Sequence, residues 1–317
     1  MFMEDSSEER MTKILTHLKE VSIQHKKNLK YYERNTKGKY DILIDFLSIK
    51  KLEGCSIETI NGYYNILTKF VKYIHKSYNK ITAEDLREYL INYQTATGVS
   101  NRSLDDIRRC ISTFFNYLEL EEIIQINSSR KIHKIKYEKM VKKPFTDIEL
   151  ERIRDNCKTL RDKALIDLLA STGCRVSEVV RMDIEDFDME TREVVVYGKG
   201  GKERVVYIDA RTKLHLQQYI KSRTDTNKAL FVTTRYPFNR LSKNVIETIV
   251  RDIGNEANVD NAHPHRFRRT LATSLINKGM PIEQVQIILG HSKLETTTIY
   301  AQVNQESVKM NHSRFTM

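Results

Sequence analysis

The chain has 317 residues, of which 40% are hydrophobic and 30% are charged, and its formal net charge is +11 at pH 7. This length allows two ordinary domains, each able to bury a core, and the composition is that of a soluble globular protein. No apolar run approaches the length of a membrane span. The excess of Lys and Arg favours a polyanionic partner, because these side chains displace counterions from phosphates, although ribosomal and membrane-surface proteins share this property.

Three features limit where the protein acts and what it needs. The first residues, MFMEDSSEER, are acidic rather than typical of a signal peptide, so we expect a cytoplasmic protein. No cysteine or carboxylate lies at a metal-ligand offset from His263, His265 or His291, so we expect no metal and no cofactor. The cysteines are scattered without a CxxC pair and are expected to be reduced and structural: Cys55, Cys110, Cys157 and Cys174.

Residues 1–39 form an N-terminal extension whose charge changes from acidic to basic along its length. It has a weak helical stripe of apolar residues. Its basic half could contact DNA or could simply be solvated.

Residues 40–129 have a helical apolar period throughout, which predicts a small all-helical domain. Thr82 and Asp85 have the spacing of a capping box, which predicts the start of a third helix. The apolar stripes of the first three helices are Tyr40, Leu43, Ile44 and Leu47, then Ile57, Ile60, Tyr63, Tyr64, Leu67, Val71 and Ile74, then Leu86, Tyr89 and Leu90.

A fourth helix is expected over residues 103–118, with apolar side chains inward and arginines outward. The inward set is Ile107, Ile111, Phe114, Phe115 and Leu118, and the outward set is Arg102, Arg108 and Arg109. The domain is then either a plain helical bundle or a domain that holds DNA against its basic faces.

Residues 130–143 are rich in lysine, with Glu138 as the one carboxylate, and have little apolar periodicity. This composition predicts a basic linker between two domains. Such a linker is suited to lie along a phosphate backbone, but solvation alone would also explain its charge.

Residues 144–317 are expected to form a second domain, which opens with Pro144 and a capping box of Thr146 and Glu149. We expect a helix through Leu160 and another over residues 164–169. Two β-branched runs around GKGGK then predict a hairpin over residues 193–208, with Lys199 at its tip. The glycines do not form a phosphate-binding P-loop, because GxxxxGK[ST] is absent.

The stretch HPHRFRRTLATSLINKGMPIEQVQIILGHSKLETTTIY, residues 263–300, concentrates imidazoles, guanidiniums and a phenol, groups that can hold and attack a phosphodiester. Pro264 suits the start of a helix. Gly279 and Pro281 indicate its end and the start of a second helix, which Gly290 ends.

Within this stretch, His265 and Arg268 share a helix face and could converge on one anion. His291 lies at a helix C-terminus, where the dipole favours its protonated form, and Tyr300 follows nine residues later. Each feature alone also fits a solvated helix face, a common helix end or a half-buried tyrosine. The functional interpretation therefore depends on the whole set.

Six residues occur in a specific order and in the contexts STGCRVSE, GKGGK, HPHRFRR and LGHS: Arg175, Lys199, His265, Arg268, His291 and Tyr300. This set resembles the motif of the tyrosine recombinase family, which includes phage integrases, transposon integrases and bacterial chromosome-dimer resolvases. The resemblance is strong over residues 144–317, whereas over residues 40–129 it rests on a helical architecture like that of the family's core-binding domain. Arg269 stands where many relatives have His, and the first 39 residues are short for the arm-binding domain of some integrases.

The resemblance implies a mainly α fold with a small β-hairpin in the catalytic domain, arranged as a two-domain, C-shaped DNA clamp. It also implies double-stranded DNA as the partner, a homo-tetramer on two DNA sites with the C-terminal segment of one subunit docked on its neighbour, and possible directionality or accessory factors. Neither a membrane nor a cofactor is implied.

The same resemblance implies a role for each matched residue. Tyr300 would attack a backbone phosphate and form a 3′-phosphotyrosyl link. Arg175 and Arg268 would clamp the non-bridging oxygens, and Lys199 would protonate the leaving 5′-oxygen. His265 would assist as acid, base or hydrogen-bond partner, and His291 would donate to a phosphate oxygen.

Glu178, one turn after Arg175, is expected to support the site by orienting Arg175 or His265. The alternative is a surface carboxylate that balances Arg181.

The predicted function is site-specific DNA recombination for the integration or excision of a mobile element. An alternative with the same chemistry is a resident recombinase that resolves chromosome dimers. A non-catalytic DNA-binding regulator would not need Tyr300, and a nicking-closing topoisomerase would relax supercoils without pairing two sites.

Overall fold

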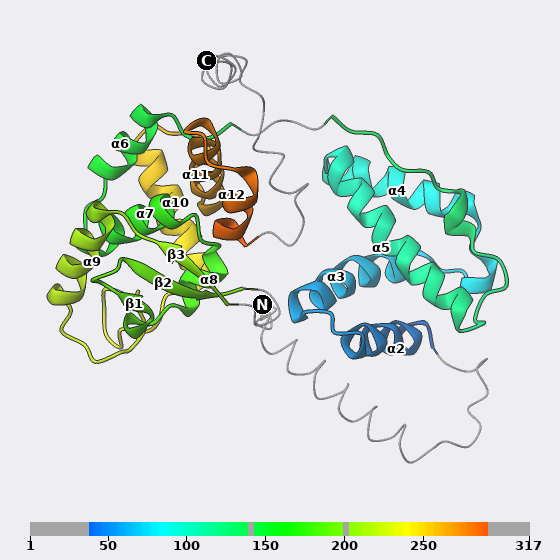
Figure 1. Ribbon diagram of the computed structural model, residues 1–317. Helices are drawn as coiled ribbons and strands as arrows, with labels where there is room; N and C mark the ends of the chain where they lie inside the picture. Colours follow the sequence, from blue (N-terminus) through cyan, green and yellow to red (C-terminus); the bar gives the residue numbers. More distant parts are fainter. Residues whose placement is uncertain (1–37, 139–142, 199–202, 291–317) are drawn as a thin grey trace. The chain divides into compact units, whose positions relative to one another are not determined.

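The computed structural model describes residues 38–138, 143–198 and 203–290 (Figure 1). The chain divides into two compact units, Met1–Met140 and Val141–Met317, called here the N-terminal and C-terminal units. Helices dominate the described residues of both units, and the C-terminal unit also holds a three-stranded sheet. The predicted mainly helical fold with a small sheet is confirmed. Among the described residues, none of the helices has both the length and the apolar character needed to cross a membrane.

The described part of the N-terminal unit consists mainly of four helices, and a side-chain hydrogen bond to the backbone marks the start of each. They are α2 (Lys39–Leu52), α3 (Ile57–Tyr73), α4 (Ala83–Thr97) and α5 (Asn101–Leu120), with 3-10 turns at Tyr78–Lys80 and Ser128–Lys131. The predicted capping box of α4 is present, because the hydroxyl of Thr82 accepts from the backbone N–H of Asp85 and the Asp85 carboxylate accepts from that of Thr82.

Aromatic side chains fill the core between these helices. Phe46 of α2 meets Phe114 of α5 edge to face, with ring centroids 5.2 Å apart. The five inward residues predicted for α5 are all buried. The stripe predicted for α2 is partly wrong: Tyr40 is 47% exposed, and the buried face consists of Ile42, Leu43, Phe46 and Leu47.

Arg108 of α5 does not point outward as predicted. Its guanidinium lies 2.7 Å from the buried carboxylate of Asp105, which also accepts from the backbone N–H of Ile135 at 3.0 Å. Ile132 and Ile135 pack against the same core. The stretch after α5 therefore has apolar contacts with the N-terminal unit, whereas residues 139–142 lie outside the described ranges.

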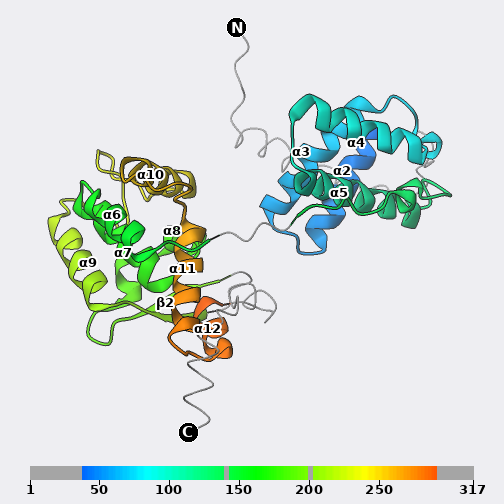
Figure 2. The same ribbon diagram turned by 90° about the horizontal axis from the view of Figure 1, so that it is seen from above.

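The C-terminal unit begins with three helices, α6 (Asp147–Asp155), α7 (Leu160–Thr172) and α8 (Val176–Arg181). The predicted capping box of Thr146 and Glu149 starts α6. The predicted extension of this helix through Leu160 is wrong, because the hydroxyl of Thr159 accepts from the backbone N–H of Asp162 and starts α7 there. Helix α7 is the centre of the unit and lies between α9 (Ala210–Ser222) and α11 (Pro264–Asn277) in both views (Figures 1 and 2).

The sheet has the order β1 (Phe187–Asp188), β2 (Glu193–Tyr197) and β3 (Glu203–Tyr207), and all its pairs are antiparallel. The predicted hairpin is confirmed, with Val194 opposite Val206 and Val196 opposite Arg204. Residues 199–202 between β2 and β3, including Lys199, lie outside the described ranges.

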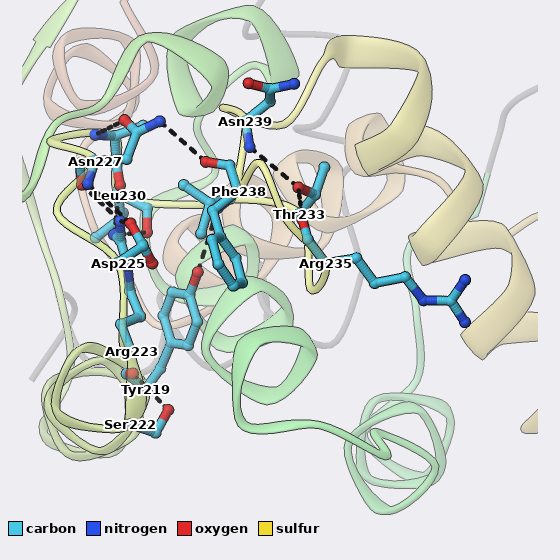
Figure 3. A network of polar contacts seen from close by, with 12 residues as sticks. Tyr219, Ser222, Arg223, Asp225, Asn227, Leu230, Thr233, Arg235, Phe238 and Asn239 are labelled. Carbon is cyan, nitrogen blue, oxygen red and sulfur yellow. Dashed lines mark hydrogen bonds and ion pairs between the residues drawn. The ribbon is translucent and has the colours of Figure 1, made fainter.

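Between α9 and α10 (Lys243–Glu256), a polar network holds an irregular segment against the unit (Figure 3). The buried guanidinium of Arg223 pairs with the Asp225 carboxylate and donates to the backbone carbonyls of Ala229 and Leu230 at 2.6 and 3.2 Å. The Tyr219 hydroxyl accepts from the backbone N–H of Val232 at 3.3 Å. These bonds satisfy backbone groups that no regular element would pair.

The last two described helices are α11 and α12 (Ile282–Leu289). Pro264 occupies the first turn of α11, as predicted. Gly279, with φ of +89°, follows the end of α11, and Gly290, with φ of +64°, caps α12.

Candidate active site

Arg175 immediately precedes α8, and its side chain is oriented by the third residue of that helix. The Glu178 carboxylate accepts from the backbone N–H of Arg175 at 2.8 Å and from its Nη1 at 2.9 Å. The Arg175 side chain is 33% exposed. A guanidinium fixed at one edge and open to solvent elsewhere is suited to receive an anion.

Arg268 reaches the same place from α11. Its side chain is buried and donates to the carbonyl of Gly173 at 2.9 Å and to that of Leu289. The Nη2 of Arg175 donates to the neighbouring carbonyl of Gly290 at 3.1 Å. The fold therefore brings Arg175 and Arg268 together at the C-terminal end of α12.

His265 lies one turn before Arg268, and the residue as a whole is exposed. Crowding by protein atoms lowers the pKa of His265, and the positive charges of Arg268 and Arg175 lower it further. The ring is therefore mainly neutral at pH 7. His265 and Arg268 are three residues apart on α11 and so lie on the same side of the helix.

The start of α11 is anchored to α6, which fixes the direction of the helix that carries His265 and Arg268. Arg266 donates to both carboxylate oxygens of Glu149 at 2.9 Å and stacks on Phe145, with 4.1 Å from its guanidinium carbon to the ring centroid. The hydroxyl of Thr270 accepts from the backbone N–H of Phe145 at 2.8 Å. The capping box of α6 therefore also positions the site.

Glu178 is buried, which contradicts the interpretation of a surface carboxylate that balances Arg181. It contacts Arg175, one of its two predicted partners, and also Arg204 of β3, whose Nη1 and Nη2 donate to its two oxygens at 2.8 and 2.9 Å. Burial alone would raise the pKa of Glu178, but the hydrogen bonds and charge of Arg204, joined by Arg175, lower this pKa to about 2.

Arg204 was missed by the sequence analysis, although a signal was available. Side chains alternate between the faces of a strand, so Arg204 shares a face with Val206. Val206 is buried, and its partner across the hairpin, Val194, is buried too. A charged residue on the apolar face of a strand calls for a buried partner, here Glu178.

Three further predicted site residues, Lys199, His291 and Tyr300, lie outside the described ranges. Gly290 directly precedes His291 in the chain. Among the described site residues, Arg175 and Arg204 share the carboxylate of Glu178, whereas Arg268 donates to backbone carbonyls. Three guanidiniums and one carboxylate leave an excess of positive charge suited to an anion. In the described ranges, no cluster of His, Cys, Asp and Glu is arranged to hold a metal ion.

Comparison with known proteins gives a consistent result for both units. The chain matches the model of the phage integrase family over residues 143–307 and that of the phage integrase N-terminal SAM-like domain over residues 42–125. Tyrosine recombinase XerA of Pyrococcus horikoshii is 32% identical over 271 residues, which cover 85% of this chain and 91% of the relative.

Two solved structures share the fold at lower identity. A crystal structure of a lambda integrase dimer bound to a COC′ core site has a TM-score of 0.70 at 18% identity and covers 84% of this chain and 95% of that chain. A structure of the Tn1549 transposon integrase in complex with circular intermediate DNA has a TM-score of 0.62 at 20% identity. The match covers 93% of this chain and 98% of that chain. Three findings agree with the order of the motif residues: the matches to two family models, the extent of the match to XerA and the shared fold. The chain is therefore a site-specific recombinase of the phage integrase family, a tyrosine recombinase.

Proposed function

We propose that the protein cuts and rejoins double-stranded DNA at specific sites through a 3′-phosphotyrosyl intermediate, with Tyr300 as the nucleophile. The observation that carries this proposal is the convergence of Arg175 and Arg268 at the end of α12, with His265 one turn before Arg268 on α11. The next motif residues in the chain are His291 and Tyr300. The net charge of +11 and the DNA named in the lambda and Tn1549 integrase structures support DNA as the partner.

In the proposed reaction, the Tyr300 oxygen attacks the phosphorus while the bond from phosphorus to the 5′-oxygen breaks. The leaving oxygen takes a proton from Lys199, and the neutral ring of His265 is suited to accept the phenol proton. Rejoining reverses these transfers, with a DNA 5′-hydroxyl as the attacking group. The number of phosphoester bonds is conserved, so the step consumes no ATP.

The charge that grows on the non-bridging oxygens is stabilised by Arg175 and Arg268, because a guanidinium presents a planar fork of donors to such oxygens. His291 donates a further hydrogen bond. Glu178 supports the reaction by fixing the fork of Arg175.

We further propose that the enzyme works in the cytoplasm as a homo-tetramer on two DNA sites, with residues 301–317 of each subunit docked on a neighbour and with accessory factors setting direction. Residues 40–129 would form the core-binding domain, residues 130–143 the linker and residues 144–317 the catalytic domain. Integration or excision of a mobile element is the proposed role. Resolution of chromosome dimers remains the alternative, because the similar proteins include both Xer recombinases and integrases of a phage and a transposon.

The direct test is the covalent adduct. Short nicked duplexes tiled across the DNA that flanks the gene are incubated with the protein and separated on a denaturing gel. Wild-type protein should form an adduct that Tyr300→Phe abolishes with unchanged DNA affinity, because only the nucleophilic oxygen is lost. Tyr236→Phe, which alters a phenol that is 88% exposed, should form the adduct normally. Specific DNA binding by wild-type protein without an adduct would favour the non-catalytic regulator.

A further inference from the structure

Three different guanidiniums meet the C-terminal end of α12. Arg204 Nε donates to the carbonyl of Ile288 at 2.8 Å, Arg268 Nη2 to that of Leu289, and Arg175 Nη2 to that of Gly290 at 3.1 Å. The last carbonyls of a helix lack partners within it and carry partial negative charge, so cations are favoured there. These bonds fix the end of α12 relative to β3, α11 and the start of α8.

Arg204 is more buried than Arg175, the arginine that shares Glu178 with it. Its side chain is 9% exposed and that of Glu178 is 2% exposed, compared with 33% for Arg175. Its two terminal nitrogens bind both oxygens of Glu178, and its third nitrogen binds Ile288. Arg204 therefore joins the carboxylate that orients Arg175 to the helix end that leads into His291.

Gly290 shows how closely Arg204 is packed against this helix end. A Cβ atom added to Gly290 would lie 2.9 Å from Cδ of Arg204 and 3.0 Å from its Nη1. These distances are so short that a side chain at position 290 would force the Arg204 side chain to shift. Gly290 thus provides the left-handed cap of α12 and also the space that Arg204 occupies.

We propose that Arg204 is a positioning residue of the recombination reaction, which holds the Arg175 guanidinium, through Glu178, in register with the end of α12. The proposal rests on the proposed function, in which Arg175 binds the phosphate under attack. Lysine at position 204 would keep the charge but could not bind two carboxylate oxygens and a carbonyl with one planar fork. Glu178 would then be held mainly by Arg175, and the Arg175 fork would turn from the position that the phosphate requires.

The first test compares Arg204→Lys with Arg223→Lys. Arg223 is the matched control, because its buried guanidinium also binds a carboxylate and backbone carbonyls, in a network remote from Arg175 along the chain (Figure 3). Both variants should lose thermal stability. In single-turnover adduct formation on the nicked duplexes, Arg204→Lys should be slower by about 10- to 100-fold, because small misplacements of reacting groups carry penalties of this size. Its DNA affinity should stay within about 2-fold, and Arg223→Lys should react at the wild-type rate.

A second pair of variants moves Arg204 without replacing it. Gly290→Ala and Gly279→Ala both place a side chain at a left-handed position, but a Cβ at Gly279 would meet no heavy atom within 4 Å. Gly290→Ala should slow adduct formation, whereas Gly279→Ala should not. The double variant of Gly290→Ala and Arg204→Lys should be no slower than the slower single variant, because both substitutions disturb the same contact.

Each outcome has a distinct meaning. If wild-type protein forms an adduct and Arg204→Lys forms it at the same rate, or if Arg223→Lys is slowed equally, the positioning role is overturned while the proposed function stands. If Arg204→Lys is too unstable to assay, the comparison of Gly290→Ala with Gly279→Ala is the test. Equal rates of adduct formation by these two variants would overturn the positioning role of Arg204. If wild-type protein binds a duplex specifically but forms no adduct on it, both the proposed function and this inference fail.

Discussion

At the scale of single residues, the carboxylate of Glu178 contributes to the way the stability of the C-terminal unit depends on pH. Its pKa falls from 4.5 to about 2 on folding, so its contribution is complete above the unfolded value and is lost as pH falls from about 4.5 towards 2. The shift corresponds to about 3 kcal/mol at pH 7. Glu178→Gln should remove this contribution, and the difference in unfolding free energy from wild type should narrow by about 2 kcal/mol between pH 7 and pH 3.

Urea titrations at pH 7 and pH 3 measure the difference in unfolding free energy between wild type and Glu178→Gln. Hydrogen exchange of the α8 amides reports whether the loss of stability includes this helix. Glu247→Gln is the control, because the Glu247 side chain is 42% exposed and lies 3.8 Å from its Lys243 partner. It should stay close to wild type at both pH values. A Glu178→Gln deficit that is equal at pH 7 and pH 3 would contradict the proposed linkage.

At the scale of elements, the helix starts depend on local capping bonds, and one of them gives a direct test. Thr82→Ala removes the acceptor for the Asp85 N–H and should destabilise the N-terminal unit by about 1 kcal/mol. Thr113→Ala is the matched control, since that hydroxyl donates to the carbonyl of Arg109 within α5, and its loss should change stability by less than about 0.5 kcal/mol. Thermal unfolding followed by circular dichroism compares the two variants, and equal losses would refute the cap's contribution.

Local patterns predicted the elements well where chain-neighbour chemistry decides the structure. The capping boxes at Thr82 and Thr146, the hairpin and the glycine ends of the last two helices follow from bonds between residues close in sequence. One error, the helix extended through Leu160, came from a local cap at Thr159 that was overlooked. Another came from a distant contact, because Tyr40 is exposed where Phe46, which the predicted stripe omits, meets α5.

In the candidate site, a contact between residues close in sequence could be predicted, whereas pairings between distant residues could not. The order of the motif residues and the contact between Arg175 and Glu178, three positions apart, could be read from the sequence. The pairing of Arg204 with Glu178 and with Ile288, which are far from it in the chain, required the fold.

At the scale of the whole molecule, the two units have separate hydrophobic cores, so damage to one core should not unfold the other. Phe114→Ala removes a fully buried ring from the N-terminal unit and should cost that unit about 3–5 kcal/mol. Hydrogen exchange followed by mass spectrometry should then show faster exchange in α4 and α5 and unchanged protection in α7. Phe267→Ala, in the C-terminal core, should give the reverse pattern. Loss of protection in both units from either substitution would show that they unfold as one.

The three bonded carbonyls at the end of α12 also limit how the length of the chain can vary. Successive residues of a helix differ by about 100° in direction, so inserting or deleting one residue in α12 would turn Ile288, Leu289 and Gly290 away from all three arginines at once. Insertions in the irregular segment between α9 and α10 involve no such rotation. Length differences among related chains should therefore accumulate in that segment and be rare within α12.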